Sequence, residues 1–310
     1  MQNFQIQNLG GEKFAGNSIR DVEAVKDLVR IRIDTYSKYF ENYKNFDIHF
    51  FRKLLKLQPI PIWVGERSIA DSKPISIWRS SILKEEEYSA EDFPISRFYH
   101  RPPEMKKTTE LGRCNKSGQI IFYGAESGLV SYAETIDSFT KSQKEALQVG
   151  IAKWGVKKNL MLAVVGNFEE MEKHEELREL RSAFLNAQMG DELKDLLLKW
   201  HVVLGTLFAI EDKRVYRLTS MLANYFFSNQ HVDGLIYPSV KFSRLLKENN
   251  TDFQPGFNYA ILPGSLQMNE SIQMELCSIY DFVKVDANSV KSEVVRRHNE
   301  INILEGLIKF

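Results

Sequence analysis

Apolar residues recur at helical spacing in several parts of the chain. In the first of these parts the apolar positions are three or four residues apart, at Val22, Val25, Val29, Ile33 and Tyr36. This interval places the side chains on one face of a helix, so the pattern predicts a helix from Asp21 to about Phe40. The same reasoning predicts further helices beginning at Gly128–Thr135, over 140–156, within 168–200 and over Arg214–Phe227.

Short runs of apolar and aromatic residues, bounded by Gly or Pro, predict strands instead. These runs are Gln119–Ala125, Leu160–Val165, Gly234–Tyr237, Asn258–Leu262 and Ser271–Val283. Helices and strands do not alternate strictly along the chain, as they do in a parallel sheet with helical crossovers. The order therefore predicts an α+β fold. Residues 1–18 are polar and predicted to be irregular, and 290–310 fit neither period.

Charged residues and prolines indicate how the chain is divided. Prolines at 59, 61, 74 and 94 interrupt regular structure, and a charged stretch at 84–92 is typical of a solvated connector. The sequence thus predicts a boundary near residue 90. Residues 1–90 form a partly helical N-terminal extension, 91–285 the main domain with a helical insertion at 140–200, and 286–310 a C-terminal segment.

Composition narrows the class of protein. The 310 residues are 43% hydrophobic and 26% charged, which is typical of a globular protein. Lys plus Arg and Asp plus Glu both total 41, a balance that argues against a nucleic-acid coating protein. No apolar run approaches the roughly 18 residues of a membrane span. The first residues lack the pattern of a signal peptide, and the two cysteines are typical of reduced thiols, so we expect a cytoplasmic protein that binds neither membrane nor nucleic acid.

Common catalytic and ligand-binding motifs are missing from the sequence. It contains no Gly-x-Gly-x-x-Gly motif after a strand, no Walker A motif, no Gly-x-Ser-x-Gly motif and no Cys or His spacing typical of a metal site. Three segments do place polar residues beside apolar elements, as functional sites commonly do. They are Arg97–Pro102, Gly112–Gly118 with the following Phe122–Ala125 and Glu134, and Asp233–Ser239.

Taken in order, these segments resemble the RES family over about residues 95–285. The resemblance implies a fold like that of ADP-ribosyltransferases, with small β-sheets around a cleft and helices around them. It implies NAD⁺ as the substrate, because characterised members are toxins that destroy cellular NAD⁺ by hydrolysis or with phosphate as co-substrate. It also implies an antitoxin partner with a helix-turn-helix domain. No other cofactor and no metal is expected, and a homo-oligomer is left open.

The resemblance also implies roles for individual residues. The predicted catalytic residues are Glu134, Arg97 and Ser239. The predicted substrate-binding residues are Tyr123, Arg113, Phe98, Tyr237 and Asn115. Cleavage of the nicotinamide–ribose bond develops positive charge on the ribose, which a carboxylate stabilises, and this reaction suits Glu134. The Arg97 guanidinium suits the pyrophosphate, with Arg113 as the competitor for that task.

Each of these residues also has a structural interpretation. Arg97 also fits a surface or structural ion pair, and Tyr123, which suits a platform for a cationic ring, also fits the core as an aromatic residue of a strand. Glu134 fits a solvated helix face. Ser239 can bind phosphate or position Glu134, and it can also cap a helix that begins at Val240. Asn115 fits a turn as well as a binding site.

The alternatives for the whole protein differ in chemistry. One is an enzyme that transfers ADP-ribose to a macromolecule, and another is a module that binds NAD⁺ or ADP-ribose without turnover. A third is a structural interaction protein built on long charged helices, which predicts no nucleotide binding.

Overall fold

The computed structural model describes most of the chain in defined segments. They are residues 19–41, 63–67, 75–100, 102–166, 190–229, 232–248, 256–286, 290–298 and 300–310, with a few single positions between 178 and 186. The chain forms two compact units. The first comprises Met1–Arg67, Glu110–Gln119 and Leu160–Pro238, and the second comprises Ser68–Thr109, Ile120–Asn159 and Ser239–Phe310. The boundary predicted near residue 90 falls inside the second unit.

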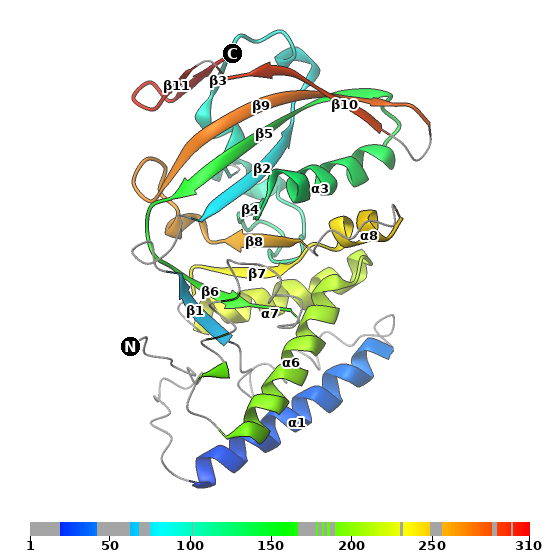
Figure 1. The fold of residues 1–310 in the computed structure, drawn as a ribbon, viewed down its shortest axis with the longest axis vertical. Coiled ribbons are helices and arrows are strands. Elements are labelled where there is room, and N and C mark those ends of the chain that lie inside the picture. The colour runs from blue at the N-terminus through cyan, green and yellow to red at the C-terminus, as the bar shows by residue number, and fades with distance from the viewer. Residues whose placement is uncertain are drawn as a thin grey trace. The chain divides into compact units, whose positions relative to one another are not determined.

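The first unit combines helices with a small group of strands (Figure 1). Its elements are α1 (Ile19–Glu41), β1 (Trp63–Arg67), β6 (Leu160–Val164), α6 (Asp191–Ala209), α7 (Tyr216–Asn229) and β7 (Gly234–Pro238). Strand β6 pairs antiparallel with β1 and parallel with β7. Helix α1 packs on α6 through Tyr36 and Trp200, whose ring centroids are 4.9 Å apart in an edge-to-face contact.

The second unit contains an antiparallel arrangement of long strands. Its strands are β2 (Ser76–Ile82), β3 (Asp92–Pro94), β4 (Phe122–Ala125), β5 (Ala146–Val156), β8 (Phe257–Ile261), β9 (Ile272–Lys284), β10 (Val290–Arg297), β11 (Glu300–Asn302) and β12 (Leu307–Lys309). The main strands lie in the order β8-β4-β2-β5-β9-β10, and β11-β12-β3 form a smaller sheet. Its helices are α3 (Gly128–Thr140) and α8 (Val240–Glu248).

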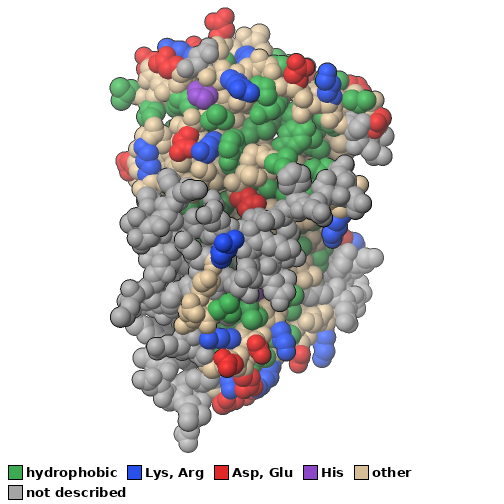
Figure 2. All heavy atoms as spheres, viewed as in Figure 1, with side chains coloured by type: hydrophobic (Ala, Val, Ile, Leu, Met, Phe, Trp, Pro, Cys, Tyr) green, Lys and Arg blue, Asp and Glu red, His purple; other side chains and the backbone are tan. Residues whose placement is uncertain are grey.

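Helix α3 covers one face of this sheet (Figure 1). Phe139 of α3 packs in a buried cluster with Leu147, Val149 and Ile151 of β5 and with Phe282 of β9. Figure 2 shows apolar side chains gathered on the visible face of the second unit, over α3 and the strands beside it. Burial of the cluster around Phe139 fixes α3 against the sheet, and with it the helix backbone that carries the polar side chains of α3.

The predicted α+β class is confirmed. The predicted helices at Asp21–Phe40 and Arg214–Phe227, and the predicted strands that begin near 119, 160, 234, 258 and 271, correspond to observed elements. Residues 1–18 and the 168–189 part of the predicted helical region lie outside the described residues, apart from single positions. Residues 290–310, left unassigned by the pattern, form β10, β11 and β12. None of the described helices is long and apolar enough to cross a membrane.

The helix predicted over 140–156 is wrong, because Ala146–Val156 is the long strand β5. It is a central strand, hydrogen-bonded to β2 along one edge and to β9 along the other, and residues on both of its faces are buried. Apolar residues therefore occupy both faces, and some of them fall by coincidence at helical intervals. The β-branched Val149 and Ile151 favour a strand, and Gly150 is unfavourable in the interior of a helix. The predicted insertion at 140–200 accordingly begins with sheet rather than with helix.

Candidate functional site

Glu134 lies on α3 at the edge of that helix's buried face. The helix begins after Ser127, whose hydroxyl accepts a hydrogen bond from the Val130 amide at 3.2 Å. Val130 and Ala133 are buried together with Phe242 of α8. Because Glu134 directly follows a buried position, its side chain emerges at the border between α3 and α8 and is 30% exposed. The carboxylate is thus partly accessible yet anchored by the packing beneath it.

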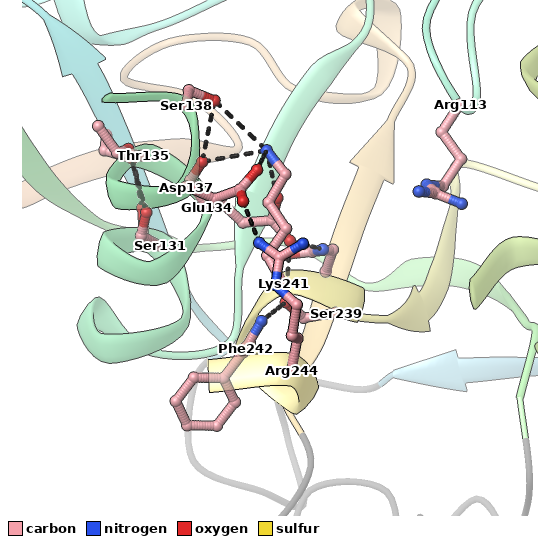
Figure 3. A network of polar contacts seen from close by, with 12 residues as sticks. Arg113, Ser131, Glu134, Thr135, Asp137, Ser138, Ser239, Lys241, Phe242 and Arg244 are labelled. Atoms are coloured by element: carbon pink, nitrogen blue, oxygen red, sulfur yellow. Dashed lines mark hydrogen bonds and ion pairs between the residues drawn. The ribbon is translucent and has the colours of Figure 1, made fainter. Parts of the chain in front are cut away.

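Ser239 immediately precedes α8 and is fully buried. Its amide donates a hydrogen bond to the Gly256 carbonyl at 2.8 Å. Its hydroxyl accepts a bond from the Phe242 amide at 3.3 Å and donates to Oε1 of Glu134 at 2.8 Å (Figure 3). Two of the roles that the sequence left open for this residue, helix capping and contact with Glu134, therefore occur together.

Asn258 on β8 is a member of this cluster that sequence reasoning missed. Its side-chain amide donates to the same Oε1 of Glu134 at 2.9 Å, and the residue is only 7% exposed. One signal was available in the sequence. Asn258 is the only amide in the apolar run Phe257–Ile261, and a polar side chain in a buried strand requires a hydrogen-bond partner.

Lys241 approaches the other oxygen of the Glu134 carboxylate. Its ammonium lies 3.4 Å from Oε2 of Glu134 and 3.2 Å from the Glu134 carbonyl oxygen. It also lies 3.5 Å from Asp137, one helical turn farther along α3. Figure 3 shows α8 presenting Lys241 and Arg244 toward the acidic residues of α3. Both oxygens of Glu134 therefore have polar neighbours from elements distant in the sequence.

Asp137 gathers positive charge around this part of the site. Lys141 lies 2.7 Å from one oxygen of Asp137, and Arg244 forms a hydrogen-bonded ion pair with the same oxygen. Burial raises the pKa of the Asp137 carboxyl, but the hydrogen bonds and charges of Lys141, Lys241 and Arg244 outweigh it, so the pKa is lowered. Asp137 is thus held in its charged form, as a fixed negative charge between α3 and α8.

Strand register places Tyr123 on the same face of the sheet as this cluster. Asn258 and Ala125 are directly paired across β8 and β4, and paired residues point to the same face. Tyr123 lies two residues before Ala125 on β4, so its side chain points to that face as well. The side chain is partly exposed. The register therefore places Tyr123 on the face of the sheet from which Asn258 contacts Glu134.

The chain matches no protein-family model, no curated protein and no solved structure. The candidate site is therefore supported by the contacts around Glu134 and by the resemblance of the sequence to the RES family. Within the described part of the chain, no three His, Cys, Asp or Glu side chains come together in a way that would hold a metal ion.

Arg97 is engaged elsewhere in the second unit. Its guanidinium donates to Glu87 through Nε at 2.6 Å and through Nη2 at 2.9 Å, and Nη2 also donates to the Ile82 carbonyl at 2.7 Å. The fork that was predicted to bind phosphate thus holds a carboxylate of the chain itself. The hydrogen bond from Arg97 is the main cause that lowers the pKa of Glu87.

The ion pair between Arg97 and Glu87 should make the stability of the fold depend on pH. The pKa of Glu87 in the folded protein lies below the ordinary value of 4.5, so the pair stabilises the fold fully above that pH and progressively less as the pH falls through the folded pKa. We expect Glu87→Gln and Arg97→Met to lower the unfolding free energy at pH 7 by similar amounts. The difference in unfolding free energy between Glu87→Gln and the wild type, measured by denaturant titration, should become smaller below pH 4.5.

The same two variants test whether Arg97 contacts substrate. If Arg97 serves only the ion pair, Arg97→Met should change turnover of the implied substrate, NAD⁺, no more than Glu87→Gln does. A large loss of turnover in Arg97→Met with normal turnover in Glu87→Gln would return Arg97 to the catalytic set.

Phe98 is fully buried, although it was predicted to bind substrate. Its ring lies 5.8 Å from the Phe93 ring in an edge-to-face contact and covers Gly150 of β5. This position belongs to the core rather than to a surface that substrate can reach.

The remaining predicted residues belong to the first unit. Arg113 donates to the carbonyl oxygens of Phe208 and Ile210, the latter at 2.9 Å, and its guanidinium lies over the Tyr216 ring. Asn115 donates to the Glu110 and Lys116 carbonyls at 2.8 and 2.9 Å, the turn-shaping role left open from sequence.

Tyr237 on β7 is also in the first unit. It is 5% exposed, and its ring centroid lies 6.0 Å from that of Phe208. All three of these residues thus have a local structural function. Their proposed contacts with substrate remain predictions.

The two serine caps of the second unit provide a matched pair of variants. Ser239→Ala and Ser127→Ala each remove one N-cap hydroxyl, so each should lower the unfolding free energy by about 1 kcal/mol. Only Ser239 also holds Glu134. If Glu134 is catalytic, Ser239→Ala should lower turnover by up to about 10²-fold through misplacement of the carboxylate, whereas Ser127→Ala should leave it unchanged. Equal turnover in the two variants would remove Ser239 from the site.

Proposed function

We propose that the protein is an NAD⁺-consuming enzyme that cleaves the nicotinamide–ribose bond, with Glu134 at the ribose, and that it acts as an intracellular toxin or defence effector. One observation carries the proposal. The hydroxyl of Ser239 and the amide of Asn258 both converge on one oxygen of Glu134 from positions 105 and 124 residues away. NAD⁺ as the substrate, and an ADP-ribosyltransferase-like RES fold, rest on the sequence resemblance.

The fixed carboxylate suits the charge that develops in this reaction. When the glycosidic bond breaks, its electron pair leaves with nicotinamide, which becomes neutral, and positive charge spreads over the anomeric carbon and ring oxygen of the ribose. A carboxylate that is already oriented stabilises that charge without reorganising. Glu134 also offers an acceptor site to a ribose hydroxyl, because its oxygens together carry about four such sites and Ser239, Asn258 and Lys241 face three of them.

Tyr123 supports the same proposal from the sheet. It shares the face of Asn258, and an aromatic ring attracts a cationic ring such as oxidised nicotinamide. The pyrophosphate anchor is less well supported, because Arg97 would have to leave Glu87 to bind phosphate. We therefore assign the ribose and nicotinamide ends of the substrate to the second unit and leave the phosphate contacts unassigned.

The reaction is completed by an oxygen nucleophile that bonds to the anomeric carbon. Water gives ADP-ribose and releases a proton, whereas inorganic phosphate gives ADP-ribose phosphate. Chromatography of NAD⁺ incubated with purified protein, with and without phosphate, separates these products. Free nicotinamide supports the proposal in either case. ADP-ribose that becomes attached to an added protein indicates ADP-ribosyl transfer instead. Intact NAD⁺ together with a thermal shift indicates a binding module.

A further inference from the structure

Lys241 links two acidic residues of α3 that lie one helical turn apart. Its ammonium is 3.4 Å from Oε2 of Glu134 and 3.5 Å from Oδ2 of Asp137. The Glu134 carbonyl and the Ser138 hydroxyl lie 3.2 and 3.4 Å from the same nitrogen. An ammonium group has three donors, so at most three of these four acceptors are bonded at once, and all four belong to α3. The side chain is only 27% exposed, which further limits its freedom.

Asp137 is itself fixed by other cations. Lys141 and Arg244 both pair with its Oδ1, which leaves Oδ2 toward Lys241. Asp137 is 8% exposed, and two of its partners, Lys241 and Arg244, belong to α8. Asp137 therefore provides a stationary anchor for the ammonium of Lys241, and Lys241 transmits that position to Glu134.

We infer that Lys241 is a positioning residue for Glu134, and this inference rests on the proposed function. Ser239 and Asn258 donate hydrogen bonds to Oε1, and Lys241 forms an ion pair with Oε2, so each oxygen of the carboxylate has a partner that restrains its orientation. A carboxylate held at one oxygen alone can rotate about its terminal bond, a torsion that is broad in carboxylic side chains. With Lys241 in place, the unused lone pair of Oε2 has one direction in which to meet a ribose hydroxyl.

Lys141 provides the matched control. It pairs with the same Asp137 at 2.7 Å and carries the same charge, but it is 61% exposed and is the residue that caps the C-terminus of α3. Lys141→Met thus removes one cation from the cluster, while Arg244 still pairs with Oδ1 of Asp137 and the Lys241–Glu134 contact stays in place. If Lys241 acts only as one more positive charge near Asp137, the two methionine variants should behave alike.

The test measures steady-state NAD⁺ turnover in three variants. Lys241→Met should lower kcat by about 10- to 10²-fold with a smaller change in KM, because the carboxylate is misoriented rather than removed. Lys141→Met should keep the wild-type kcat, and Lys241→Arg should recover most of the loss because it restores a donor to both carboxylates. Equal kcat in Lys241→Met and Lys141→Met would overturn the inference.

A second readout separates this inference from the proposed function. If the wild-type protein leaves NAD⁺ intact, the proposed function fails whatever Lys241 does. Crystal structures of Lys241→Met and Lys141→Met then decide the positioning role alone. A Glu134 carboxylate that turns away from Asn258 and Ser239, or adopts several orientations, only in Lys241→Met supports the inference. An unchanged carboxylate in that variant overturns it.

Discussion

Glu134→Gln should abolish NAD⁺ turnover, by about 10³-fold or more, while the protein stays folded. The substitution keeps the shape of the side chain but removes the negative charge that stabilises the ribose cation. The amide oxygen can still accept from Ser239 and Asn258, whose bonds to Oε1 are 2.8 and 2.9 Å long in the wild type. The amide nitrogen then faces Lys241, so an unfolding free energy lower by about 1 kcal/mol is the expected cost.

The measurement is nicotinamide release from NAD⁺, together with thermal unfolding by circular dichroism. Glu293→Gln is the control, because it removes the same charge from an exposed position on β10. That variant should keep wild-type turnover. Turnover within a few fold of wild type in Glu134→Gln would remove Glu134 from the catalytic role, even if the enzyme itself consumes NAD⁺.

Phe98→Ala should cause the largest loss of stability, about 3–5 kcal/mol in the free energy of unfolding. The ring is fully buried, and its removal leaves a cavity between β5 and the Phe93 ring. Phe98→Leu should recover much of the loss, because it refills part of that volume. Denaturant titration measures both variants. A stable Phe98→Ala protein with a raised KM for NAD⁺ would contradict the core position and favour the substrate contact predicted from sequence.

Gly150 tests the same contact from the other side. A Cβ built at Gly150 would lie 2.1 Å from Cε1 of Phe98, which is far inside contact distance. Gly150→Ala should therefore destabilise the fold on its own. In the double variant with Phe98→Ala the methyl group has room, so the combined loss should be smaller than the sum of the two single losses. Additive losses would show that the two residues do not share this space.

Sequence patterns predicted elements well where one face of the element is buried. The helix predicted from Asp21 is observed as α1, and Val29 and Tyr36 of its predicted apolar face are buried. The pattern failed at β5, where residues on both faces of the strand are buried and seven of the eleven residues are apolar. Periodicity carries no information when there is no polar face to set against the apolar one.

The candidate site shows the same division between local and distant information. The motif resemblance selected Glu134 and Ser239, and the structure places them 2.8 Å apart through a hydrogen bond. It could not select Asn258 or Lys241, because their relation to Glu134 depends on the pairing of β8 with β4 and on the packing of α8 against α3. It also could not show that Arg97 donates its hydrogen bonds to Glu87. Such contacts are properties of tertiary structure.

The proposal that the protein cleaves NAD⁺ is tested most directly by a proton NMR time course of NAD⁺ with a catalytic amount of wild-type protein. If the proposal is right, the signals of nicotinamide bound to ribose decline while those of free nicotinamide grow, and the free nicotinamide reaches a many-fold molar excess over the protein. Nicotinamide signals that stay unchanged, under conditions where circular dichroism shows the protein folded, would contradict it.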